Sequence, residues 1–189
     1  MKNFIKKSML VFSSFTFLFL VSCQNNSEET SAVQAPTEIG SALMEGTSEM
    51  TPILVGETSN QAVWLEYIQA HNDRDLDKIA EINADDWEGY TADGSVLKGT
   101  DAHIETLDNW FKTASPKWEV KWMIANAAKN KDGVIEQWLT TGNDYTDVDP
   151  DGNPIFEYNV HDILFVDGKI KKINVYKRAQ PVESAEFSY

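Results

Sequence analysis

The sequence predicts a single α+β domain over residues 60–178, and three features of the chain support this fold class. Apolar residues recur first with helical spacing, between residues 60 and 114. Four long runs with strand-like alternation then follow, between residues 117 and 178. Short turns rich in Asp, Asn and Gly join these runs, which favours an antiparallel sheet of neighbouring strands. Helices followed by a series of strands are typical of α+β domains.

The first predicted helix begins at Ser59 or Asn60, residues that can cap a helix N-terminus. Trp64, Tyr67 and His71 lie on one face of it, because residues three or four positions apart share a helix face. We expect this face to point into the core, with His71 in a core or capping role.

Two more helices are predicted, one on each side of a hairpin. Asp75 precedes the apolar pattern of the second helix, and Thr100 precedes that of the third. Both are residue types that cap helices. The hairpin between them covers residues 87–99 and turns at Asp93-Gly94, a dipeptide that favours tight β-turns. His103 lies beside the apolar stripe of the third helix, and we interpret it as a boundary residue.

Alternation along the predicted strands assigns side chains to faces of the sheet. In "KWEVKWMI", it places Trp118, Val120, Trp122 and Ile124 on one face. In "YNVHDILFVDGKI", it separates His161 from Asp162, because neighbours on a strand point to opposite faces.

The N-terminal residues predict export and lipidation. Lys2, Lys6 and Lys7 precede an apolar run of signal-peptide length, which is short for a membrane span. The run ends in "LVSC", which resembles the lipobox of bacterial lipoproteins, where the Cys is lipidated. We expect a signal peptide over residues 1–22 and lipidation at Cys23. A transmembrane anchor or a non-lipidated signal peptide is the alternative.

The remaining segments outside the domain are polar. We expect residues 23–59 to hold the lipidated Cys and a disordered tether, because they are rich in Ser, Thr, Glu and Gln. Residues 179–189 form a predicted tail. The predicted location is the cell envelope, anchored to a membrane through lipid and either periplasmic or surface-exposed.

Charge restricts the partners. The formal net charge is −14, and loss of the three signal-peptide lysines would make it more negative. A strongly acidic surface repels phosphate groups, so we expect no nucleic-acid partner and no membrane contact beyond the lipid anchor.

Element order and short motifs together resemble a known superfamily. The motifs are "NDRDLDKI", "YTADG" and a final "F-x-DGKI" turn. They are similar to those of the nuclear transport factor 2-like superfamily, in particular its SnoaL-like branch. The resemblance implies a cone-shaped, curved antiparallel sheet wrapped around three helices, with an interior pocket. It also implies a possible homodimer through the convex sheet face.

The resemblance implies one candidate catalytic residue. SnoaL-like cyclases carry an acid on the strand before a "GKI" turn, and Asp162 matches that position in "DILFVDGKI". A carboxyl facing an apolar cavity has a raised pKa and can act as a general acid or base. Tyr158 would then share its face, and His161 would point to the convex face. The alternative is a structural acid. No histidine lies on the preceding strand to serve as its partner.

Aromatic residues provide the candidate ligand-binding set, which suits a small apolar or cyclic molecule. The set consists of Tyr67, Trp87, Tyr90, Trp110, Trp122, Trp138 and Tyr158, with Trp64 as a further candidate. We expect no cofactor. No metal site is expected either, because the three histidines lie on separate elements.

The turn "DVDPDGNP" was considered as a calcium site. Asp147, Asp149 and Asp151 match the start of a calcium loop, but the twelfth position is Tyr158 and not Glu. We therefore expect a hairpin turn here.

Three functions are compatible with these features. The preferred one is a lipid-anchored domain that binds a small molecule in its cavity. The alternatives are an isomerase or cyclase that uses Asp162, and a dimeric protein-interaction module. Fold alone does not choose between them.

Overall fold

The computed structural model of the chain describes residues 37–43 and 48–179. The predicted signal peptide, Cys23 and residues 180–189 lie outside this part of the chain. Within the described residues, no helix is both long enough and apolar enough to cross a membrane.

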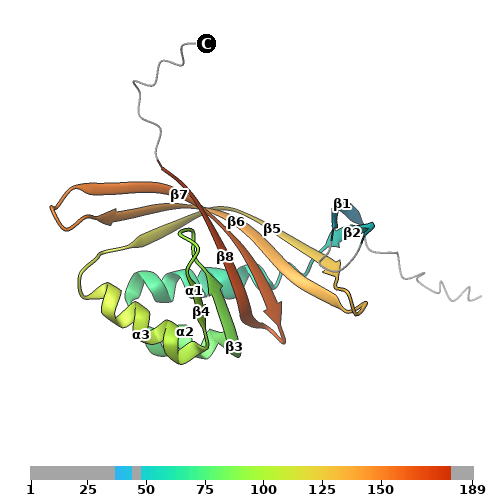
Figure 1. Cartoon of the computed structure of the whole chain (residues 1–189), viewed down its shortest axis with the longest axis horizontal. Helices are drawn as coiled ribbons and strands as arrows, with labels where there is room; N and C mark the ends of the chain where they lie inside the picture. Colours follow the sequence, from blue (N-terminus) through green and yellow to red (C-terminus); the bar gives the residue numbers. More distant parts are fainter. Residues whose placement is uncertain (1–36, 44–47, 180–189) are drawn as a thin grey trace, which may run out of the picture. The chain divides into compact units, whose positions relative to one another are not determined.

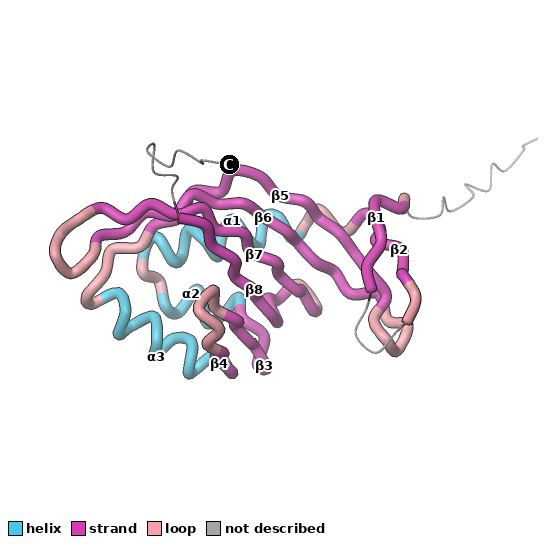
Figure 2. Tube along the Cα trace, turned by 45° about the horizontal axis from the view of Figure 1, so that its top comes forward, coloured by secondary structure: helices cyan, strands magenta, loops and turns pink. Residues whose placement is uncertain are grey.

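The described residues form three helices, α1 (Asn60–Asp73), α2 (Leu76–Ile82) and α3 (Thr100–Phe111). All three lie on the concave side of a curved sheet (Figures 1 and 2). The predicted α+β fold class, with a curved sheet around three helices, is therefore confirmed.

The helix caps are partly as predicted. The Asp75 side chain accepts a hydrogen bond from the backbone N–H of Lys78, so it caps α2. The prediction that Thr100 caps α3 is wrong. Gly99 occupies the N-cap position, and the Thr100 hydroxyl instead donates to the carbonyl oxygen of Ala84. This hydrogen bond therefore connects the start of α3 to β3.

Eight described strands form one sheet in the order β1-β2-β5-β6-β7-β8-β3-β4. Their bounds are β1 (Glu38–Leu43), β2 (Met50–Val55), β3 (Asn83–Tyr90), β4 (Val96–Lys98), β5 (Lys117–Lys129), β6 (Ile135–Val148), β7 (Pro154–Val166) and β8 (Lys169–Ala179). The predicted antiparallel meander is β5 to β8. The hairpin of β3 and β4 joins this meander through a parallel pairing of β3 with β8.

The prediction of a disordered tether is wrong for residues 38–43 and 50–55, which form strands β1 and β2. They pair with each other, and β2 also pairs with β5 through residues 53–55. The segment is largely exposed and has little apolar periodicity, which is why its sequence resembles a linker. Pairing with the edge of β5 satisfies its backbone groups despite this composition.

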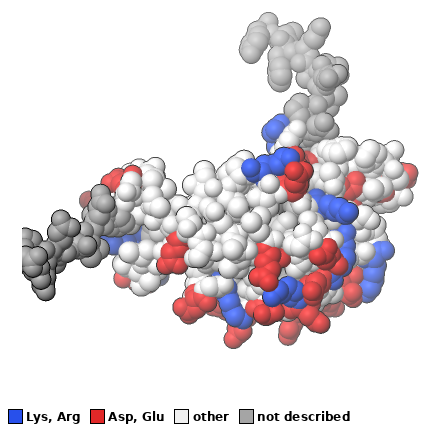
Figure 3. Space-filling view, turned by 180° about the vertical axis from the view of Figure 1, so that it is seen from behind, with Lys and Arg blue, Asp and Glu red and all other residues white. Residues whose placement is uncertain are grey.

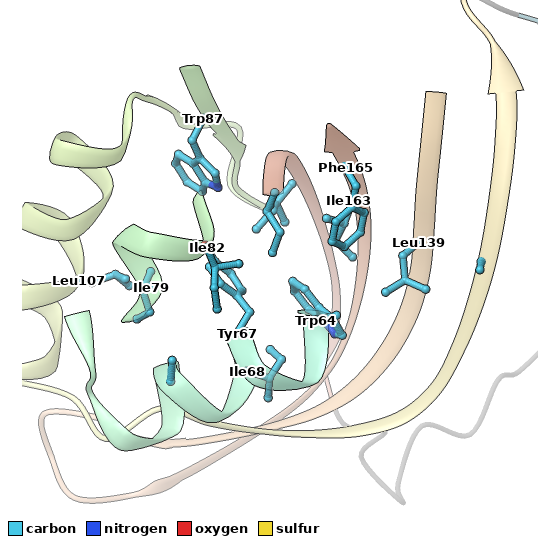
Figure 4. Packing of buried hydrophobic residues seen from close by; sticks show 14 residues of the cluster. Trp64, Tyr67, Ile68, Ile79, Ile82, Trp87, Leu107, Leu139, Ile163 and Phe165 are labelled. Atoms are coloured by element: carbon cyan, nitrogen blue, oxygen red, sulfur yellow. The ribbon is translucent and has the colours of Figure 1, made fainter. Parts of the chain in front are cut away.

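The main core lies between the helices and the concave sheet face. Trp64 of α1 points toward Leu139 and Ile163 of the sheet (Figure 4), and all three side chains are almost fully buried. Ile79 and Ile82 of α2 belong to the same cluster. This packing fixes α1 against the sheet and positions the residues described next.

Candidate functional site

A cavity of about 340 Å³ opens between the helices and the concave sheet face. Its lining is mostly aromatic and aliphatic, and polar groups occur at a few positions. The residues that line it are Trp64, Tyr67, Ile68, His71, Trp87, Gly89, Tyr90, Thr91, Leu97, His103, Thr106, Leu107, Trp110, Trp118, Tyr145, Glu157, Asn159, His161, Ile173, Val175 and Lys177. A cavity of this kind is typical of small-molecule sites.

Helix α1 forms one wall. The predicted face is confirmed, because Trp64, Tyr67 and His71 are all buried and all line the cavity. The Nδ1 atom of His71 lies 2.8 Å from the carbonyl oxygen of Tyr67, one turn earlier in the helix. This contact holds the imidazole against the Tyr67 ring, at 4.4 Å between ring centroids.

His103 of α3 belongs to a second wall. Its ring stacks on the Trp87 indole, with centroids 3.9 Å apart and planes at 7°. Its Nδ1 atom lies 3.1 Å from the amide nitrogen of Asn83. The Tyr67 hydroxyl donates to the other side of that amide, Asn83 Oδ1, at 3.0 Å. A hydrogen-bonded chain thus connects α1, β3 and α3 beside the cavity. His103 is a cavity residue and not the boundary residue that was predicted.

His161 of β7 completes the set. Its Nδ1 atom lies 2.9 Å from the amide nitrogen of Asn143 on β6. Its ring lies beside Trp64, at 5.2 Å between centroids. The chain has three histidines, and all of them therefore line this one cavity.

Burial keeps these imidazoles neutral. It lowers the pKa of His71 to about 4, partly offset by the hydrogen bond to Tyr67. Burial, and to a smaller extent the neighbouring His71, lower the pKa of His103 and of His161 to about 3. A charged imidazole in a low-dielectric interior without a counter-charge is unfavourable.

Four of the predicted ligand-binding aromatics, Tyr67, Trp87, Tyr90 and Trp110, line the cavity. The other three, Trp122, Trp138 and Tyr158, do not, and their predicted placement is wrong. They lie on the opposite face, which we call the outer face of the sheet and define by Trp122, Ile124, Trp138, Thr140, Tyr158, Val160, Asp162 and Tyr176.

A β-bulge at Lys121 explains the error at Trp122. Val120 pairs with Asn143, and Trp122 pairs with the next residue, Gly142, so Lys121 is an extra residue in β5. One extra residue reverses the alternation beyond it. Val120 consequently packs on the core, whereas Trp122 is 45% exposed on the outer face.

The prediction that Asp162 faces the cavity is also wrong. Asp162 pairs with Thr140 and Asn174 across the sheet, and its Oδ1 accepts a 2.9 Å hydrogen bond from the Thr140 hydroxyl. It is partly buried on the outer face, where burial raises its pKa and the Thr140 bond lowers it. His161, expected on the convex face, is the residue that enters the cavity.

A second β-bulge lies in β8, the strand that pairs with β7. From the Asp167-Gly168 turn, an uninterrupted register would pair Asp162 with Ile173, which is buried. An extra residue at Lys171 shifts the register, so that Ile163 pairs with Ile173. The three-residue spacing of Ile170 and Ile173, in "IKKI", is the sequence signal for this bulge.

Several lining residues were not predicted as ligand-binding. The rings of Trp118 and Tyr145 lie with centroids 5.2 Å apart and planes tilted at 56°, and the Trp118 indole N–H donates to Asn159 Oδ1 at 3.2 Å. Asn143 and Asn159 directly face each other on β6 and β7, and both are buried. Polar residues at paired inward positions of a sheet are the pattern that could have indicated them.

The acidic turn between β6 and β7 is the predicted hairpin turn. Asp149 accepts hydrogen bonds from the backbone N–H groups of Asp151 and Asn153, so its carboxylate organises the turn. Asp147 is buried and accepts from the Tyr145 hydroxyl at 2.6 Å. Among the described residues, no three His, Cys, Asp or Glu side chains lie together in a way that could hold a metal ion.

Comparison with known proteins identifies the fold class. No family model and no curated protein matches the sequence. Among solved structures, the chain is similar to an epoxide hydrolase of the LEH-like type from M. tuberculosis, with a TM-score of 0.54 and 14% identity over 64% of this chain and 84% of that one. It is also similar to a protein assigned as a SnoaL-like polyketide cyclase from Jannaschia sp., with a TM-score of 0.51 and 14% identity over 64% and 86% of the two chains.

A third similar structure is TerC co-crystallised with polyporic acid, with a TM-score of 0.53 and 16% identity over 64% of this chain and 92% of that one. Identities this low show the fold alone. The chain therefore has the nuclear transport factor 2-like α+β fold.

Proposed function

We propose that this protein is a small-molecule-binding domain whose ligand occupies the cavity between α1, α3 and the concave sheet face. The observation that carries the proposal is the cavity lining. Four tryptophans, Trp64, Trp87, Trp110 and Trp118, line the cavity together with the three histidines, whose ring nitrogens can orient a ligand. Aromatic walls with a few fixed polar groups provide both apolar contact and orientation.

The cavity volume limits the size of the ligand. About 340 Å³ lies at the lower end of ligand sites in proteins, so a molecule of two or three fused rings suits it. The bound polyporic acid of TerC is a cyclic molecule in a protein of the same fold. This similarity supports a cyclic ligand here. The functional groups of the ligand have to be inferred from the residues that line the cavity.

A substitution that fills the cavity tests the proposal. Val175 lines the cavity from β8, whereas Val160 of neighbouring β7 lies on the outer face. We expect Val175→Phe to weaken the binding of fluorene, a three-ring hydrocarbon probe, by about 5- to 150-fold, because overpacking a site costs about 1–3 kcal/mol. Val160→Phe is the matched control and should leave the affinity within about twofold, by calorimetric titration.

Equal loss of affinity in both variants, or none in either, would contradict the proposed site. Circular dichroism of the two variants separates loss of binding from loss of folding.

The alternative function, an isomerase or cyclase, lacks its candidate acid at the cavity. An isomerase or cyclase that used Asp162 would need this carboxyl at the cavity, and it lies on the other face of the sheet. The imidazoles that do face the cavity have lowered pKa values, so they are weak proton acceptors near neutral pH. Binding without turnover is therefore the function that the geometry supports best.

The outer face supports a homodimer as part of the proposal. It exposes Trp122, Ile124, Tyr158 and Tyr176, by 45%, 53%, 40% and 59%. Lys121 and Asp144, which form an ion pair at 3.2 Å, add opposite charges, so a second copy related by two-fold symmetry could meet this surface. Sedimentation equilibrium tests this: a monomer at all concentrations would exclude the dimer.

We further propose the lipid anchor at Cys23 and a location in the cell envelope. On the face of the molecule in Figure 3, acidic side chains gather along the lower part of the domain, with basic side chains among them. An acidic surface suits neither nucleic acid nor anionic headgroups, so membrane attachment would depend on the lipid. Incorporation of labelled palmitate by the wild type but not by Cys23→Ala would support the anchor, and equal labelling of both would exclude it.

A further inference from the structure

The three cavity histidines each have one ring nitrogen bound and one open. Each Nδ1 atom has a buried partner: Tyr67 O, Asn83 Nδ2 or Asn143 Nδ2. In the part of the chain that the structure describes, none of the three Nε2 atoms has a hydrogen-bond partner. None of them is among the fully buried polar atoms without a partner, so each is accessible from the cavity. The Nε2 atoms are therefore the groups available to a molecule in the cavity.

The partners decide which tautomer each neutral ring adopts. A backbone carbonyl only accepts, so Nδ1 of His71 carries the proton and its Nε2 is an acceptor. An amide nitrogen only donates, so Nδ1 of His161 accepts from Asn143 and Nε2 carries the proton. The carbonyl oxygen of Thr141, 3.5 Å from the same amide nitrogen, agrees with this orientation of the Asn143 amide.

The same reasoning applies to His103. Because the Tyr67 hydroxyl donates to Asn83 Oδ1, the amide nitrogen of Asn83 faces His103 and donates to its Nδ1. Nε2 of His103 therefore also carries a proton. Among the three imidazoles, two therefore present a donor to the cavity and one presents an acceptor.

The acidic and basic side chains that line the cavity are paired with each other. Of the residues that line it, Glu157 and Lys177 are the ones with acidic or basic side chains, and they pair with each other at 3.2 Å. The histidines are neutral, because burial lowers their pKa values. A charged ligand would lose its hydration and would find no unpaired side chain of opposite charge.

We propose that the ligand is an uncharged ring compound with a carbonyl or hydroxyl oxygen, which accepts a hydrogen bond from the Nε2–H of His103 or His161. Asn83 and Asn143 are positioning residues, because they set the tautomers that make these two nitrogens donors. His71 provides the one acceptor among the three imidazoles. This inference rests on the proposed function, since it names the ligand class of the same cavity.

The tautomers can be measured without a ligand. In ¹⁵N NMR of histidine-labelled wild-type protein at neutral pH, we expect a protonated Nδ1 in His71 and a protonated Nε2 in His103 and His161. In Asn143→Asp, the carboxylate accepts from the ring, so Nδ1 of His161 should become protonated while the signals of His71 stay unchanged. A protonated Nδ1 in wild-type His103 or His161, or no change in Asn143→Asp, would overturn the assignment.

Two matched probes test the ligand class. Fluorenone differs from fluorene by a carbonyl group at the same ring size, and the cation of aminoacridine is a charged ring compound of similar shape. We expect wild-type protein to bind fluorenone about three- to tenfold tighter than fluorene, the ratio for one neutral hydrogen bond. The aminoacridine cation should bind at least about tenfold more weakly than fluorenone.

The double variant His103→Leu/His161→Leu should still bind fluorene and should lose the preference, with a ratio near one. Equal binding of fluorene and fluorenone by the wild type would overturn this inference and leave the proposed function intact. Failure of the wild type to bind either probe would overturn both.

Discussion

Replacing Trp64 by alanine is expected to lower the free energy of unfolding by about 3–5 kcal/mol, the usual cost of truncating a large buried aromatic residue. Trp64 is 1% exposed, and its ring contacts Tyr67 and His161, so it joins α1 to β7. Urea unfolding monitored by circular dichroism measures the change.

Leu65 is the matched control for this prediction. It follows Trp64 in α1 but is 46% exposed, so Leu65→Ala should change the free energy of unfolding by less than about 0.5 kcal/mol. Similar effects of the two substitutions would mean that α1 does not pack on the sheet through its Trp64 face.

Acid is expected to unfold the protein through its three histidines. Their pKa values are about 4, 3 and 3 in the folded protein and about 6.5 when unfolded. Between these values the unfolded chain binds more protons than the folded one. Stability is therefore complete above pH ~6.5 and declines as the pH falls, by up to about 1.4 kcal/mol per pH unit for each histidine.

Urea unfolding at a series of pH values between about 7 and 5, a range that includes the histidine reference pKa, measures this slope. The chain has no other histidines, so His161→Gln should reduce the slope by about one proton. Asp162 has the opposite effect on the pH dependence of stability, because its pKa is raised in the folded protein. It is a single group, whereas three histidines contribute to the expected slope. A constant free energy of unfolding over this range would show that the imidazoles are not buried as neutral rings.

The sequence is sufficient to predict the helices, the meander and the fold class, because each rests on local periodicity. The α1 face of Trp64, Tyr67 and His71 follows from helical spacing alone. The Asp75 cap is a local interaction too. Such features do not depend on distant parts of the chain.

The faces of the strands could not be predicted in the same way. The bulges at Lys121 and Lys171 each reverse the alternation, and a bulge depends on the pairing between strands. The bulge at Lys121 explains why alternation places Trp122 inside the cavity, whereas the prediction for Asp162 rested on its match to the cyclase motif. The strands β1 and β2 were missed because their stability comes from pairing with each other and with β5.

The cavity histidines depend on tertiary structure for the same reason. His71, His103 and His161 are far apart in the sequence, and no spacing motif relates them. Their common environment arises because α1 and α3 pack on the face of the sheet that carries His161. The sequence does contain Asn143 and Asn159, which pair across β6 and β7 and indicate a polar inward position of the sheet.

Tryptophan resonances test the central claim, that the ligand site is the cavity inside the sheet, most directly. The chain has six tryptophans, of which Trp64, Trp87, Trp110 and Trp118 line the cavity, whereas Trp122 and Trp138 lie on the outer face. In ¹⁹F NMR of fluorotryptophan-labelled protein, titration with fluorene should shift the resonances of the cavity residues and leave those of Trp122 and Trp138 unchanged. Shifts confined to Trp122 and Trp138 would contradict the account and place binding on the outer face.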